Sequence, residues 1–171
     1  EGEDGINFLK HIFNDRGPMK TYNKRDNVKY FPIKKSDLID LTEVITQGFP
    51  PETNLWISTS IDAVYIEDNS IEAFISHKEI PDLLHRYEIH VATSSSKSFH
   101  SEKLVILNVY SKYQSHLAVE GFDQTWVLGK FQLINDFIEK LFDNYENEKK
   151  ITASNEAIAI KYEGNKITVP N

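Results

Sequence analysis

The sequence predicts an α+β domain: a mostly antiparallel sheet, a long helix packed on it and a helical N-terminal region. Three observations lead to this prediction. Segments of alternating polar and apolar residues recur between 55 and 121 with short connections, which favours antiparallel pairing. Residues 131–150 carry an apolar stripe at helical spacing with a charged opposite face. The length of 171 residues fits one domain of ordinary size.

Residues 1–50 predict a helix, a hairpin and a second helix, which we take as an N-terminal subdomain. Asp4 caps the first helix, and a Gly-Pro pair ends it. Alternating residues after a polar turn predict a short hairpin over 21–33. Ser36 is the expected N-cap of the second helix, and Pro50-Pro51 marks the boundary behind it.

Residues 51–150 predict the α+β core. After the first two strands, Asn69 and Glu72 have the spacing of a capping box, so we expect a helix that is interrupted near Pro81. The fourth strand is apolar almost throughout, which places it in the centre of the sheet. The expected strands are 55–61, 63–67, 87–93, 103–110 and 116–121.

Residues 151–171 predict a C-terminal β-hairpin. Short apolar alternations flank Gly164-Asn165, a pair that favours a two-residue turn. An exposed hairpin at the end of the chain could pair with that of a second copy, so a homodimer is compatible with the sequence.

Composition limits the classes of function. The net charge of −7 argues against non-specific nucleic-acid binding by the whole surface. There is no cysteine, which excludes disulfides and cysteine-ligated metals and fits a reducing compartment. We find no apolar run of the roughly 20 residues that cross a bilayer and no signal segment, so we expect a cytoplasmic location. Because Glu1 rather than Met stands first, we also expect a fragment or a processed product.

The basic residues are concentrated in residues 16–35, which hold seven lysines and arginines against one acid, Asp26. This segment carries +6, so the rest of the chain carries −13. Lysines with interleaved aromatic rings could bind single-stranded nucleic acid or an acidic protein partner. Nucleic-acid binding is expected to be possible only through this segment. Neutralisation of the chain's own acidic face is the simpler interpretation. The predicted binding surface is Lys20, Tyr22, Lys24, Arg25, Lys29, Tyr30, Lys34, Lys35 and, from further along the chain, Trp126.

Candidate catalytic residues are His90, His116, Glu88 and Glu120. If strands 87–93 and 116–121 flank the central strand, the alternation of residues puts all four on one face of the sheet. Imidazoles with carboxylates could perform acid–base chemistry or hold a divalent metal. A polar, solvated sheet face is the simpler explanation, because none of the helical zinc-site spacings is present.

Other motifs give weaker signals. The loop over 93–103 is rich in hydroxyls, but it has no glycine and so lacks the close backbone approach of a phosphate-binding loop. No G-x-S-x-G turn is present, and no cofactor is expected. Trp126 lies between two glycines just before the long helix, where a tryptophan either closes a pocket, anchors an interface or fills the junction of sheet and helix.

We therefore expect a non-enzymatic protein-interaction or regulatory domain with a protein partner. An acidic inhibitor or immunity-type partner of a basic toxin is one version, and a sensory or assembly module is another. The first alternative is a metal-dependent hydrolase or phosphoesterase that uses His90, His116 and nearby carboxylates. The second is a small-ligand-binding domain with a pocket between the long helix and the sheet, beside Trp126.

Overall fold

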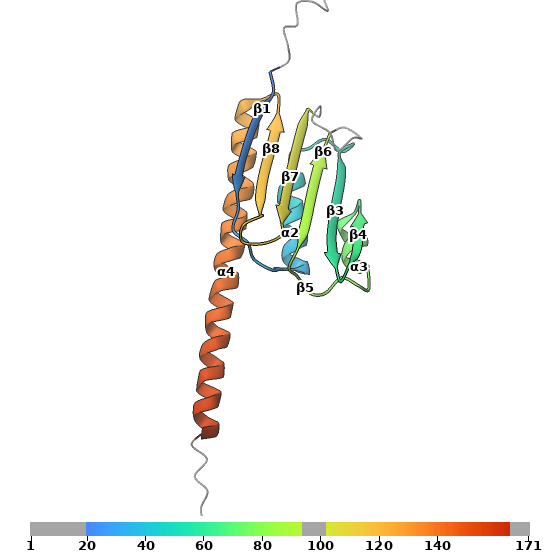
Figure 1. Cartoon of the computed structure of the whole chain (residues 1–171). Coiled ribbons are helices and arrows are strands. Elements are labelled where there is room, and N and C mark those ends of the chain that lie inside the picture. Colours follow the sequence, from blue (N-terminus) through green and yellow to red (C-terminus); the bar gives the residue numbers. More distant parts are fainter. Residues whose placement is uncertain (1–19, 94–101, 165–171) are drawn as a thin grey trace, which may run out of the picture.

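Six strands form one antiparallel sheet in the order β1-β8-β7-β6-β3-β4 (Figure 1). The computed structural model describes residues 20–93 and 102–164, and the side chains of the last helix up to Glu156. The strands of the sheet are β1 (Tyr22–Asn27), β3 (Asn54–Ile61), β4 (Val64–Asp68), β6 (Tyr87–Ala92), β7 (Lys103–Val109) and β8 (His116–Gly121). A second, two-stranded sheet joins β2 (Ile33–Lys34) to β5 (Leu83–Leu84), and the helices are α2 (Lys35–Thr46), α3 (Ile71–Ser76) and α4 (Gln124–Gly164).

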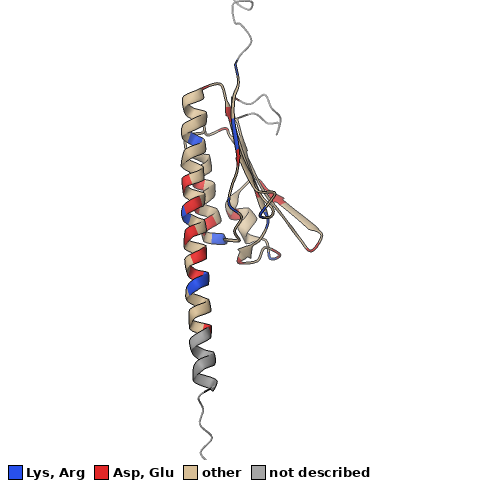
Figure 2. Cartoon of the chain, turned by 60° about the vertical axis from the view of Figure 1, so that its left-hand side comes forward, with Lys and Arg blue, Asp and Glu red and all other residues tan. Residues whose placement is uncertain are grey.

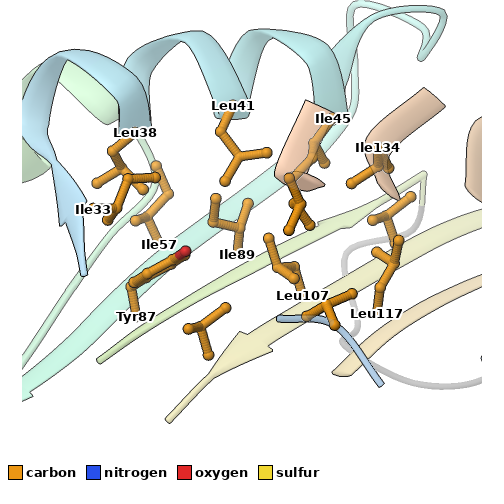
Figure 3. Packing of buried hydrophobic residues seen from close by; sticks show 14 of the residues in the cluster. Ile33, Leu38, Leu41, Ile45, Ile57, Tyr87, Ile89, Leu107, Leu117 and Ile134 are labelled. Atoms are coloured by element: carbon orange, nitrogen blue, oxygen red, sulfur yellow. The ribbon is translucent and has the colours of Figure 1, made fainter. Parts of the chain in front are cut away.

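The helices lie on one face of the large sheet, which Figure 2 shows nearly edge-on. Alternate side chains of the central strands point to this face and pack under α2 and α4. Figure 3 shows Ile89, Leu107 and Leu117 beneath the isoleucines and leucines of the two helices. The predicted α+β class is therefore confirmed.

Tyr87 is the one polar group of this core that stands out. Its ring is fully buried beside Ile57, and no described residue accepts or donates a hydrogen bond at its hydroxyl (Figure 3). Burial raises the pKa of Tyr87 far above its ordinary value, so the hydroxyl stays protonated.

The middle of the chain folds largely as its residue pattern predicts. The second helix is present as α2, although Lys34 rather than Ser36 occupies the N-cap and makes no side-chain capping bond. Strands β3 and β4 form a hairpin whose two turn residues, Asp62 and Ala63, both have positive φ. That combination gives a type I′ turn, whose twist matches the twist of the strands.

Two predicted elements are wrong because long-range pairing overrides the local pattern. The hairpin over 21–33 does not exist: β1 pairs with β8, and β2 pairs with β5. The expected helix near Pro81 is confined to α3, which ends at Ser76, and the two leucines that follow belong to β5. Ser70, not Asn69, caps α3, and its hydroxyl oxygen accepts from the Ala73 amide.

The C-terminal hairpin is wrong for residues 151–164, which continue α4. Neither proline nor glycine stands between Lys130 and Glu163, and alanine, glutamate and lysine are strong helix formers. A helix that is already formed adds further residues at little cost, so the alternation of apolar residues there does not produce strands. With 41 residues, α4 is about 60 Å long and runs far past the end of the sheet (Figure 1).

The predicted N-terminal subdomain and the α+β core share one hydrophobic core in the structure. Strand β1 extends the same sheet as β3, and α2 packs against α4, so residues 20–50 share their apolar contacts with the rest. The helix expected at the N-terminus and most of the loop at 93–103, including His100, lie outside the described residues. Among the described residues, no helix is both long and apolar enough for a membrane span.

Candidate functional site

The open face of the sheet, opposite the helices, brings His90 and His116 into one polar chain through Asn108. The strand register puts His116, Asn108 and Glu88 in one row across β8, β7 and β6. Nε2 of His90 lies 3.0 Å from Oδ1 of Asn108, and Nδ2 of Asn108 lies 3.4 Å from Nε2 of His116. The two histidines thus lie on one face of the sheet, as expected, and the side-chain amide of Asn108 lies between them.

The chain of hydrogen bonds sets the proton positions on both rings. The Asn108 carbonyl can only accept, so Nε2 of His90 donates to it. The Asn108 amide can only donate, so Nε2 of His116 accepts and its proton is on Nδ1. Burial lowers the pKa of His116, and the charges of Arg25 and His90 lower it further. His116 is consequently neutral near pH 7.

The two carboxylates behave differently. Oε2 of Glu88 lies 3.5 Å from Nε2 of His90, and the hydroxyl of Tyr110 donates to Glu88. Burial, together with this bond, raises the pKa of Tyr110. Glu120 is buried and accepts from Asn23, about 13 Å along β8 from His116. Glu120 therefore does not join the histidines.

This arrangement offers little for catalysis. Both Nε2 atoms already bond to Asn108, and among residues 20–93 and 102–156 no three side chains of His, Asp or Glu are grouped to hold a metal ion. A bound metal would have to displace the amide. The hydrolase alternative gains no support from the open face, whose polar chain suits a solvated surface.

The predicted basic surface is mostly paired with the chain's own acids. Nζ of Lys29 lies 2.5 Å from Glu139, and Nζ of Lys34 lies 2.7 Å from Glu148, both on α4. Longer contacts of 3.5 Å and 3.9 Å join Lys24 to Asp26 and Lys35 to Asp82. Acidic and basic bands alternate along α4 in Figure 2. Two lysines of the basic segment thus pair with acids of α4, and two pair with acids elsewhere in the chain.

The remaining members of that surface are scattered. Lys20 lies over the ring of Tyr22 at 5.0 Å, at the start of β1. Arg25 is exposed on the open face, where its cross-strand partner is Ala118. Tyr30 is half-buried and packs against the hydrophobic core. The nine residues therefore do not form one patch.

Trp126 fills the junction of sheet and helix. Its ring meets that of Phe49 edge-on at 5.5 Å, and Nζ of Lys103 lies over it at 5.0 Å. Gly121 gives the ring room, because a Cβ there would lie 3.0 Å from the Glu102 carbonyl oxygen and 3.2 Å from the indole. Of the three interpretations of Trp126, this packing supports the structural one.

Lys130 holds α4 to the end of α2. It is only 5% exposed, and its Nζ donates to the carbonyls of Val44 at 2.8 Å and Gln47 at 2.5 Å. Val44 lies in the last turn of α2 and Gln47 is its C-cap, so the helix itself offers no backbone N–H donor to these two carbonyls. Burial lowers the pKa of Lys130 to about 8, with a smaller effect of the Lys103 charge.

A hollow of about 680 Å³ lies where α4 leaves the sheet. One wall is the chain after β1, and the other is a single face of α4, whose lining residues are three or four positions apart. The ring of Phe142 lines this hollow. The sequence predicted a pocket beside Trp126, which is about 24 Å away along the helix. The lining consists of Asn27, Val28, Lys29, Tyr30, Lys112, Glu139, Phe142, Glu146 and Lys149.

A shallow strip of surface continues from it along α4, and Lys149 belongs to both. Its other lining residues lie between Tyr145 and Glu156, on the part of α4 that projects beyond the sheet. Sequence reasoning missed this surface, because residues 151–171 were expected to form strands. The spacing of Glu139, Phe142 and Glu146 was the signal that could have revealed it.

The chain matches no protein-family model, and no curated protein or solved structure is significantly similar to it.

Proposed function

We propose that this protein is a non-enzymatic protein-interaction domain, which contacts its partner along the projecting part of α4 and in the 680 Å³ hollow at its base. The observation that carries the proposal is the length of α4. From Asn147 to Glu156 every side chain is exposed, and the helix continues to Gly164. We call residues 146–164 the α4 arm.

The α4 arm has the properties of a docking element. A helix without tertiary contacts is marginally stable in water at this length, and most helices in proteins are stabilised by packing of one face. Ile151 is 60% exposed on the arm, so a large apolar side chain faces water there. A partner that covers Ile151 would supply the packing that the sheet supplies to the earlier turns of α4.

The hollow gives the interaction a fixed point. It is walled on two sides, by residues that the strands and the packed part of α4 hold in place. Phe142 and Tyr30 present aromatic surface to it, and aromatic residues at the centre of a contact contribute much of the binding energy. The arm provides area, and the hollow provides a pocket for an anchoring side chain.

Site-specific photo-crosslinking tests the proposal. Glu146 at the rim of the hollow, Ile151 on the arm and Lys78 far from both are each replaced by p-benzoyl-phenylalanine in the full chain. In an extract of the source cell, irradiation should give one discrete protein adduct from positions 146 and 151 and none from 78. Adducts from all three positions alike, or from none, would contradict a contact along α4.

A small-ligand-binding role is the second candidate, because 680 Å³ is within the range of ligand pockets. Native mass spectrometry of the protein purified from its source distinguishes the two. A bound small molecule that is lost when Phe142 is replaced by Ala, with no protein adduct, favours the ligand.

A further inference from the structure

We infer that the segment bound in the hollow is acidic and apolar: a short stretch of a partner protein with a large apolar side chain next to Asp or Glu. This inference rests on the proposed function and specifies the chemistry of the same surface. It depends on which charges of the hollow are already paired.

The floor of the hollow is apolar and aromatic. Val28 is buried, Tyr30 and Phe142 are half-buried, and Phe142 packs edge-on against Phe31 at 6.4 Å between ring centroids. An apolar side chain placed there would leave water and contact rings that the core already holds in position. This selects for a leucine, isoleucine or phenylalanine in the occupant.

One lysine of the hollow is occupied. Nζ of Lys29 makes its ion pair with Glu139 and lies 4.7 Å above the ring of Phe142. The Lys29–Glu139 pair therefore adds no net charge to the hollow. An incoming charged group therefore meets the other residues of the rim.

The free charges of the rim are two lysines and one glutamate. Lys112 lies over the ring of Tyr113 at 5.9 Å, and neither it nor Lys149 has an ion-pair partner in the described part of the chain. Glu146 likewise has no cation partner there. The lining of the hollow thus holds three lysines and two glutamates, which leaves it one net positive charge in a chain of net charge −7.

A carboxylate next to the apolar anchor would pair with Lys112 and Lys149. A basic segment would instead bring a cation beside two ammonium groups, and like charges in contact weaken binding. The net charge of −7 repels a strongly acidic partner at long range, but at physiological salt this repulsion is screened beyond about 8 Å. A short segment with a few carboxylates is the occupant that satisfies both conditions.

Peptide selection on the intact protein tests the inference. A phage-displayed library of random twelve-residue peptides is selected on the full chain, and the consensus peptide is measured by fluorescence polarisation. We expect Asp or Glu next to Leu, Ile or Phe. Affinity should fall roughly tenfold or more in the double variant Lys112→Glu/Lys149→Glu, because both carboxylate contacts become repulsive.

The control is Lys78→Glu/Lys140→Glu, which changes the net charge equally at two exposed lysines outside both the hollow and the α4 arm. We expect its affinity to stay within about twofold of the wild type, since these surface charges are screened. A basic consensus, or equal losses in the two double variants, would overturn the inference while leaving the crosslinks at positions 146 and 151 intact. No enriched peptide together with no crosslink would overturn the proposed function as well.

Discussion

The two parts of α4 differ in what holds them. Between Val127 and Leu141 one side of the helix is buried on the sheet and against α2, and Lys130 caps α2 from it. In the α4 arm, the described side chains after Glu146 are all exposed. One unbroken backbone thus joins a helix that is stabilised by packing to one that depends on propagation from it. Because the described side chains of the arm make no core contacts, its surface is available for a partner.

Two isoleucines on α4 give the largest contrast. Ile134 is fully buried, whereas Ile151 is 60% exposed. Ile134→Ala removes core contacts and leaves a cavity, so we expect a loss of about 2–5 kcal/mol in the free energy of unfolding. Ile151→Ala should change it by at most about 0.5 kcal/mol. Urea denaturation of both variants makes the comparison, and a similar loss in both would mean that the arm is packed.

The residue pattern could predict the first part of α4 but not the second. Phe131, Ile134 and Ile138 recur at helical spacing, and the sheet supplies the surface that this stripe requires. Beyond Glu146 the stripe turns polar, so periodicity no longer identifies a helix. The alternating apolar residues between 156 and 162 then suggested strands, although local propensity favoured continuation.

The candidate site shows the same limit. Alternation within strands correctly put His90 and His116 on one face, because side-chain parity is local information. Their connection through Asn108 depends on the register between strands, which the residue pattern of a single strand does not determine. The hollow combines the chain after β1, Lys112 and α4, so only the assembled fold reveals it.

Two glycines near the start of α4 differ in how closely other atoms surround them. At Gly121 a Cβ would press on the Glu102 carbonyl and the ring of Trp126, so Gly121→Ala should cost about 1–3 kcal/mol. At Gly129, on the exposed side of α4, a Cβ meets no atom within 4 Å. Gly129→Ala should therefore stabilise by about 0.5–1 kcal/mol, since alanine is the better helix former. Opposite shifts in the urea midpoint check this, and equal signs would contradict it.

Lys130 tests the attachment of α4 to α2. Lys130→Met keeps the aliphatic stem but leaves the carbonyls of Val44 and Gln47 without their donor, so we expect a loss of about 1–2 kcal/mol at pH 7. The measurement is the unfolding free energy from urea titrations. Lys140→Met, at an exposed position of the same helix, is the control and should stay within about 0.5 kcal/mol.

The same lysine predicts a pH dependence. The pKa of Lys130 is about 8 in the folded protein, below the ordinary 10.5 that applies to the unfolded chain. Between these values the folded state binds fewer protons, so stability rises with pH. A neutral amine still donates to both carbonyls. The stability difference between wild type and Lys130→Met should therefore grow from pH 8 to pH 10, and a constant difference would show that the pKa of Lys130 is not lowered.

The smallest effect is expected at the boundary itself, where the ion pair of Lys34 and Glu148 joins the end of β2 to the start of the arm. Both side chains are exposed to about half of their surface, so water and salt weaken their attraction. In a double-mutant cycle of Lys34→Met and Glu148→Gln, the coupling should amount to a melting-temperature shift of at most roughly 2 °C and should vanish in 1 M NaCl. Lys150→Met, two residues further along the helix, should show no coupling to Lys34. If the coupling persisted at high salt, or if Lys150 also coupled, the packed part of α4 would extend beyond Glu148, and the surface left for a partner would be correspondingly shorter.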